Sequence, residues 1–197
     1  PREAQDLWPA MNVDDVVGAA FLPTDGQANP SDIAMALARG ARMAGVTIAE
    51  DVAVTGFEIE HGRVRAVLTR QGRIACDKVV NCAGQWARQF GALCRQAGVN
   101  VPLVSMQHQY IVTERIDGLP DDLPTLRDPD RLTYYKEEVG GLVMGGYEPD
   151  PLDWAVDGIP EGFHWTLLDA DWDHFQPIME LALPRVPALQ TAGIQDF

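Results

Sequence analysis

The segment VVNCAGQWARQFG (residues 79–91) decides the fold of this chain. Residues 78–83, which begin at Lys78 just before the segment, form a nearly continuous apolar run. Such a run is typical of a strand buried on both faces of a sheet. The run ends on Ala83 and Gly84, and a helix is predicted to follow at once and to reach about Ala97, with Gly98 closing it. Small residues before a helix N-terminus let the backbone approach a ligand. A plain tight turn between strand and helix is the alternative.

The residues before this segment predict a helix followed by an antiparallel meander. The helix begins at NPSD, where Asn29 or Ser31 can cap it, and ends at Gly45. In VTIAEDVAVTGFEIE apolar and polar residues alternate, and the phase slips after Gly56, which indicates a bulge. Turns at HG and QG then separate RVRAVLTR and RIAC, so these strands are expected to pair with their neighbours in order.

The second half of the chain predicts mainly antiparallel structure. PLVSMQHQYIVTE reads as one long strand, and LTYYKEE and GLVMGGYE read as a hairpin around Gly140 and Gly141. A helix from about Asp169 follows, with an apolar face made of Trp172, Phe175, Met179, Ala182 and Val186. The predicted fold class is therefore α/β, with α+β character in the second half: a partial Rossmann-like domain with a meander, and an antiparallel sheet with flanking helices.

Composition narrows the classes of partner. The chain has 197 residues and a formal net charge of −14, which argues against binding nucleic acid or an anionic membrane surface. No apolar run reaches the roughly 18 residues of a membrane-spanning helix. The three cysteines lack the spacing of a zinc site, and no metal site is predicted. They are expected to be reduced and mostly buried, Cys82 included, which favours a cytoplasmic protein, or one of the mitochondrial matrix in a eukaryote.

Four pieces of the sequence, in order, carry a resemblance to a known family: LWPAMNVDDVVGAAFLPTDGQANPSD, VVNCAGQWA, HQYIVTE and YYKEEVGGLVMGGYEPDP. They resemble the D-amino-acid-oxidase-like family of FAD-dependent amine oxidoreductases, and more narrowly its dimethylglycine and sarcosine dehydrogenase branch. The resemblance implies three parts of the chain: residues 1–24 in a substrate domain, 25–101 in the centre of an FAD-binding domain, and 102–197 in the substrate-binding domain.

The resemblance also implies which residues bind FAD. Val54 matches a strand position that places its backbone against the adenine. Cys82, Ala83, Gly84 and Trp86 match the element that approaches the flavin and the pyrophosphate. Considered without the resemblance, the tryptophan is equally an ordinary packing residue at the start of a helix.

His108 and one of Tyr134 and Tyr135 match residues that line the substrate pocket. The implied reaction is oxidation of the C–N bond of dimethylglycine or sarcosine by hydride transfer to FAD, and a histidine near neutrality can accept the amine proton. Neighbouring strand residues face opposite ways, so only one tyrosine should reach the pocket. On residue pattern alone, a histidine on an amphipathic strand is more often a satisfied structural residue, and it is the family resemblance that favours a role in the pocket.

The sequence is expected to depart from the family pattern in two respects: it lacks the GxGxxG loop, and it stops at GIQDF, before a C-terminal stretch that the resemblance implies. No GxGxxG loop precedes residue 84, so the chain is expected to be a central fragment whose activity belongs to a parent protein. A folate-binding domain in the parent and self-association of the fragment are further expectations. Two alternatives stay open: the same fold acting on another amino acid or a 2-hydroxy acid, and a non-catalytic α/β module that binds another protein.

Overall fold

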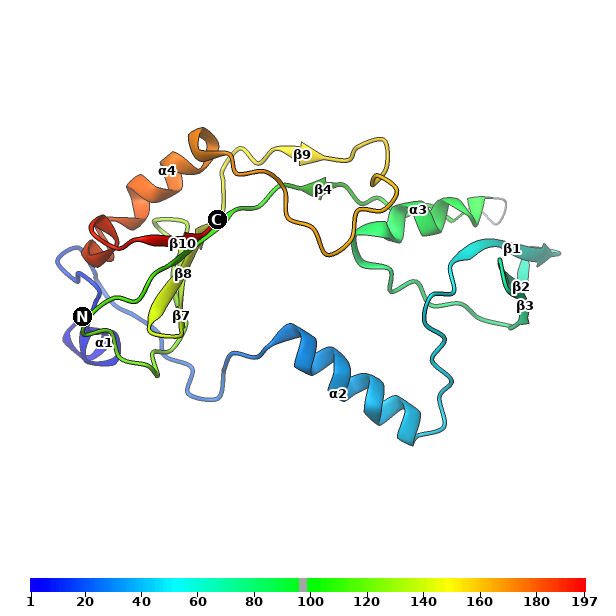
Figure 1. Ribbon diagram of the computed structural model, residues 1–197, viewed down its shortest axis with the longest axis horizontal. Helices are drawn as coiled ribbons and strands as arrows, with labels where there is room; N and C mark the ends of the chain where they lie inside the picture. The colour runs from blue at the N-terminus through cyan, green and yellow to red at the C-terminus, as the bar shows by residue number, and fades with distance from the viewer. Residues whose placement is uncertain (96–98) are drawn as a thin grey trace. The chain divides into compact units, whose positions relative to one another are not determined.

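The computed structural model describes residues 1–95 and 99–197, whose course is traced in Figure 1. The chain divides into two units, each assembled from segments that are distant in the sequence. The first unit contains residues 1–28, 107–152 and 167–197, and the second contains residues 29–106 and 153–166. The domain boundaries predicted from the sequence keep residues 102–197 together, whereas residues 153–166 lie in the second unit.

The first unit is built on a five-stranded antiparallel sheet in the order β10-β5-β8-β7-β6. Its strands are β5 (Tyr110–Thr113), β6 (Leu126–Asp128), β7 (Thr133–Glu138), β8 (Gly141–Gly146) and β10 (Ile194–Asp196). The predicted hairpin is confirmed as β7 and β8. Its two turn residues, Val139 and Gly140, have positive φ angles of 51° and 81°, which suit the right-handed twist of a tight hairpin.

The long strand predicted over residues 102–114 is wrong. Only β5 joins the five-stranded sheet, whereas β4 (Ser105–Met106) pairs with β9 (Asp153–Trp154) in the second unit. The chain passes from one unit to the other after Met106, so a single ladder cannot run through this segment.

One face of the five-stranded sheet is packed against helices. α4 (Trp172–Ala182) buries Phe175, Ile178 and Ala182. Together with α1 (Arg2–Leu7) and the 3-10 helix η3 (Pro187–Gln190), it contributes to a hydrophobic core in which Tyr135 and Met144 have no exposed surface. The predicted helix is confirmed, although Trp172 at its start is 47% exposed.

Four charged side chains hold the edge of this core together. Arg185 is 6% exposed, and its Nε donates to Asp128 Oδ2 at 2.7 Å, while its Nη1 lies 2.8 Å from Asp15 Oδ1 in an ion pair. Arg131 Nη2 lies 2.5 Å from Asp15 Oδ2. Arg185 also donates to the backbone carbonyl of Asn12. The network ties the segment after α1 to the β6–β7 turn and to the end of α4.

The second unit contains the predicted meander, formed by β1 (Val54–Glu60), β2 (Arg63–Thr69) and β3 (Gly72–Ala75). The β1–β2 register shifts between Val54 and Gly56, as the phase slip indicates. Before the meander lies α2 (Pro30–Met43), which Asn29 caps by accepting from the backbone N–H groups of Ser31 and Asp32. None of its residues is buried.

The buried strand predicted over residues 78–83 is wrong. These residues form no strand, Val80 is 81% exposed, and Cys82 is exposed rather than buried. Among the described residues no strand pairs with this segment, so its backbone has no ladder and its apolar side chains have no covering layer.

The helix predicted after Gly84 is shorter than expected in the part that the structure describes. It opens with the 3-10 turn η1 (Gly84–Trp86) and continues as α3 (Ala87–Ala92). Its predicted end at residues 97–98 lies outside the described residues. Phe90 of α3 packs edge-on against Phe57 of β1, with ring centroids 5.4 Å apart, and so joins the helix to the meander.

Two further observations concern the described residues as a whole. No helix among them has the length and apolarity needed to cross a membrane. Within residues 1–95 and 99–197, no group of three or more His, Cys, Asp or Glu side chains is arranged to hold a metal ion.

Candidate functional site

A row of four residues crosses the open face of the five-stranded sheet. The register places Tyr110 of β5 opposite Gly145 of β8, and Gly145 opposite Tyr134 of β7. Tyr134 in turn lies opposite Arg127 of β6. Residues that are directly opposite in a sheet project to the same face, so these side chains share the face that the core does not occupy.

Gly145 makes room for the tyrosine beside it. A Cβ atom built on Gly145 would meet the hydroxyl oxygen of Tyr134 and would lie 2.5 Å from Cζ of that ring and 3.0 Å from Cβ of Tyr110. Real Cβ atoms do not approach other atoms this closely. The ring of Tyr134 therefore lies across the bare backbone of β8.

Replacing Gly145 with alanine is expected to lower the free energy of unfolding by about 1–3 kcal/mol, because the added methyl group overpacks the site. Urea unfolding of the full-length protein would measure the loss. The same substitution made together with Tyr134→Ala is expected to cost much less, since the ring it collides with is gone. Equal losses in the two backgrounds would contradict this packing.

His108, just before β5, completes an aromatic cluster with Tyr134 and Tyr147. Its ring stacks on Tyr134 at a centroid distance of 6.2 Å and an interplanar angle of 25°, and it lies 5.6 Å from the ring of Tyr147. The two tyrosine rings are 5.8 Å apart. The guanidinium carbon of Arg127 lies 4.7 Å from the centre of the Tyr147 ring, within cation–π distance.

A buried carboxylate lies beside the cluster. Oε2 of Glu148 is 3.0 Å from Nδ1 of His108. The side chain of Glu148 is 5% exposed, whereas that of His108 is 42% exposed. Burial, followed by the charges of Tyr147, Tyr110 and Glu148, raises the pKa of Tyr134 to about 12. An ordinary tyrosine is already protonated at neutral pH, and this shift keeps the O–H of Tyr134 a neutral hydrogen-bond donor in alkaline solution as well.

The structure separates the two candidate tyrosines. Tyr135 has no exposed surface, and its hydroxyl lies within hydrogen-bond distance of Thr133 Oγ1 at 3.0 Å and of the Ala182 carbonyl oxygen at 3.3 Å. Because neighbouring strand residues alternate, Tyr135 points into the core while Tyr134 lies on the open face. Tyr135 is therefore a core residue, and it is withdrawn as a pocket candidate.

The residues predicted to bind FAD lie in the second unit. Val54 starts β1 and is half-buried, and Trp86 is 38% exposed at the end of η1. Gly84 has a positive φ of 53°, and a Cβ built on it would meet nothing within 4 Å. Asn81 holds the turn, because its Oδ1 accepts from Ala83 N–H and its Nδ2 donates to the Ala87 carbonyl.

This turn fits a bulky planar or phosphate-bearing group such as FAD. Ala83 and Gly84 offer small side chains and open space, and the positive φ of Gly84 is one that glycine adopts without strain. Cys82 next to them is exposed, so its thiol does not block the approach. The residues present are thus compatible with the cofactor that the resemblance implies.

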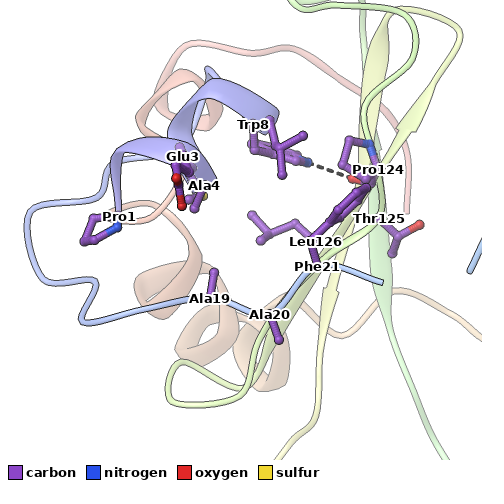
Figure 2. Close-up of a pocket in the computed structure, with 12 residues that line it drawn as sticks. Pro1, Glu3, Ala4, Trp8, Ala19, Ala20, Phe21, Pro124, Thr125 and Leu126 are labelled. Carbon is purple, nitrogen blue, oxygen red and sulfur yellow. Dashed lines mark hydrogen bonds between the residues drawn. The ribbon is translucent and has the colours of Figure 1, made fainter. Parts of the chain in front are cut away.

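A separate pocket of about 220 Å³ lies elsewhere on the first unit (Figure 2). It is bounded by α1, residues 19–21 and residues 124–126. Trp8 closes one side and donates from Nε1 to the Pro124 carbonyl at 2.8 Å. None of the predicted site residues lines it, so it is distinct from the aromatic cluster.

Sequence reasoning missed five residues of this site: Tyr110, Arg127, Gly145, Tyr147 and Glu148. Tyr110 belongs to the piece HQYIVTE, and all the others but Arg127 belong to YYKEEVGGLVMGGYEPDP, so their neighbourhood was marked but their roles were not. The hairpin turn holds the missing signal, because counting outward from it pairs Tyr134 with Gly145.

Comparisons with known proteins show the family of this chain. A family described as FAD dependent oxidoreductase matches residues 1–196. The chain is 42% identical to mitochondrial sarcosine dehydrogenase of Mus musculus, over 100% of this chain and 21% of the relative. It is 35% identical to mitochondrial dimethylglycine dehydrogenase of Rattus norvegicus, over 98% of this chain and 23% of the relative.

Two further similarities bear on function and fold. The chain is 37% identical to the mitochondrial pyruvate dehydrogenase phosphatase regulatory subunit of Mus musculus, over 98% of this chain and 22% of the relative. The crystal structure of L-proline dehydrogenase from P. horikoshii matches 98% of this chain and 49% of that one, with a TM-score of 0.78 and 25% identity.

The chain thus spans between a fifth and a quarter of the length of these three curated relatives. The family match covers nearly all of its residues, and the structural match supports the mixed α/β fold with antiparallel sheets. The predicted family, fold class and cofactor class are confirmed. The chain belongs to the family of FAD-dependent oxidoreductases.

Proposed function

We propose that the full protein oxidises an N-methylated glycine, sarcosine or dimethylglycine, at the carbon beside its nitrogen. The observation that carries the proposal is the aromatic cluster, in which an exposed histidine edge and a neutral tyrosine hydroxyl share the open face of the sheet. The names of the relatives at 42% and 35% identity support the substrate class. FAD, when bound, accepts a hydride from the substrate, and water hydrolyses the resulting iminium.

The residues of this chain would bind and orient the substrate and take its proton. Hydride loss requires a neutral amine, and His108 is the group in the cluster suited to accept a proton near neutrality. Tyr134, whose hydroxyl is protonated at neutral pH and whose pKa is raised to about 12, donates a hydrogen bond to the substrate carboxylate without adding charge. Val54 and the turn from Cys82 to Trp86 would hold FAD, with the open space at Gly84 admitting the cofactor.

The proposal also covers the cellular compartment of the protein, a further domain and its self-association. Cytoplasm is the expected compartment, or the mitochondrial matrix in a eukaryote, and the names of the relatives include mitochondrial proteins. A folate-binding domain in the same protein and self-association of this piece remain parts of the proposal.

The test is a visible absorption spectrum of the full-length protein before and after anaerobic addition of dimethylglycine or sarcosine. We expect flavin absorption bands that bleach on addition of either substrate. Flavin bands that persist would indicate that the substrate is another amino acid or a 2-hydroxy acid. A folded, colourless protein would reject the flavin enzyme.

A non-catalytic role is the second candidate function. It is favoured by the 37% identity to a protein named as a regulatory subunit, which shows that this sequence pattern also occurs in proteins named for regulation. Flavin that binds but is reduced by none of the amines or 2-hydroxy acids would support that role.

A further inference from the structure

We propose that Glu148 is a positioning residue that keeps the Nδ1–H tautomer of His108 and so leaves Nε2 as the proton acceptor of the ring. The catalytic consequence rests on the proposed function, whereas the tautomer does not. Glu148 is absent from the residues that the sequence identifies, and its role follows from its burial and its contact with His108.

Neighbouring strands bring the two residues together. His108 lies two residues before Tyr110 of β5, and Glu148 lies three residues after Gly145 of β8. Tyr110 and Gly145 are opposite each other in an antiparallel pair, so the chain leaving β8 runs alongside the chain entering β5. The contact between Oε2 of Glu148 and Nδ1 of His108, at 3.0 Å, is therefore a product of the sheet register.

Because Glu148 is buried, its carboxylate depends on the contact with His108. Its side chain is 5% exposed, and Oε1 has no hydrogen-bond partner among the described residues. The imidazole is the one side-chain hydrogen-bond partner that the described part of the chain supplies to this carboxylate. A buried carboxylate with so few partners depends strongly on each of them.

The chemistry of the two groups fixes the direction of the hydrogen bond. A carboxylate oxygen accepts hydrogen bonds, and Nδ1 is the ring atom that faces Oε2 of Glu148 at 3.0 Å, so the proposed arrangement puts the proton on Nδ1. In the neutral ring the other nitrogen, Nε2, then holds the lone pair. Stacking of His108 on Tyr134 restrains the plane of the ring in addition. Glu148 thus selects which nitrogen accepts a proton.

The first experiment measures the tautomer independently of any reaction. Full-length protein labelled with [15N]histidine is compared with the His108→Asn variant, which identifies the His108 signals by their loss. We expect the 15N chemical shifts of the neutral ring to show a protonated Nδ1 and an unprotonated Nε2. A proton on Nε2 would overturn the proposal.

The second experiment is a double-mutant cycle on the rate of flavin reduction by sarcosine. Glu148→Gln keeps the shape of the side chain and removes its charge. We expect it to slow reduction about 100-fold and to leave the Kd for substrate within about twofold. In a His108→Ala background the same change is expected to add little, because Glu148 acts through the histidine.

A charge-matched control separates positioning from folding. Glu180→Gln removes an exposed carboxylate of α4 in the same unit and is expected to leave the rate unchanged. If Glu148→Gln and His108→Ala each slowed flavin reduction by the same factor alone and in combination, the two residues would act independently, and this result would overturn the role of Glu148. Failure of the unmodified protein to be reduced by either N-methylated glycine would instead reject the proposed function, and the NMR measurement would still decide the tautomer.

Discussion

Replacing Arg185 with alanine is expected to lower the free energy of unfolding of the first unit by about 3–5 kcal/mol. The guanidinium is nearly buried and bridges Asp128 and Asp15, at 2.7 and 2.8 Å. Its removal leaves the carboxylate of Asp128, whose side chain is 10% exposed, without its shortest ion pair. The cost is thus mainly that of an uncompensated buried charge.

Urea unfolding of the full-length protein, followed by tryptophan fluorescence, would measure this loss. Trp8 is 2% exposed and packs in the same core, so it reports on this unit. Arg39→Ala, at an exposed position of helix α2, is the control and is expected to change stability by less than about 0.5 kcal/mol. A loss below about 1 kcal/mol for Arg185→Ala would show that the network contributes no more than a surface ion pair.

The contribution of Asp15 to this network should depend on pH. A hydrogen bond from Arg131 is the largest cause that holds the pKa of Asp15 below its ordinary value of 3.8. A carboxyl group whose pKa is lower in the folded state stabilises the fold above its unfolded pKa and loses that effect as pH falls. Arg185 also lowers the pKa of Asp15, so the part of the Arg185→Ala destabilisation that comes from Asp15 is expected to disappear below about pH 4, in unfolding curves recorded across that range.

The elements that the sequence predicts correctly are those specified by neighbouring residues. The β7–β8 hairpin, the meander and the Asn29 cap each depend on a turn or cap whose chemistry is local. The strand predicted over residues 78–83 fails because its apolar pattern needs pairing strands, which the described residues do not provide. Periodicity identifies what a segment can bury but not whether a layer exists to cover it.

The candidate site likewise combines features that neighbouring residues specify with features that depend on residues distant in the sequence. Alternation along β7 requires that Tyr134 and Tyr135 face opposite ways, yet only the packing of α4 reveals which one faces the core. The contact between Glu148 and His108 joins residues 40 positions apart, beyond the reach of local pattern reading. His108 was found because a family resemblance marked it, and its catalytic role stays a prediction.

Replacing His108 with alanine is expected to slow flavin reduction by sarcosine about 10²–10³-fold, because the proton acceptor for the substrate ammonium is lost. Tyr134 cannot take over this role, since burial raises its pKa to about 12 and its hydroxyl remains protonated. Anaerobic stopped-flow measurement of flavin bleaching in the full-length protein would give the rate, with flavin content confirming that the variant is folded.

The pH dependence of this variant distinguishes loss of a proton acceptor from loss of packing. Without His108, reduction is expected to depend on the small fraction of substrate amine that is already neutral, so the rate should rise about tenfold for each unit of pH below the pKa of that amine. A packing defect would instead lower the rate by a similar factor at every pH. His164→Ala, at an exposed position in the second unit, serves as the control and should match the unmodified protein throughout. If His108→Ala also reduced the flavin at the rate of the unmodified protein at every pH, the histidine would be a structural residue of the aromatic cluster.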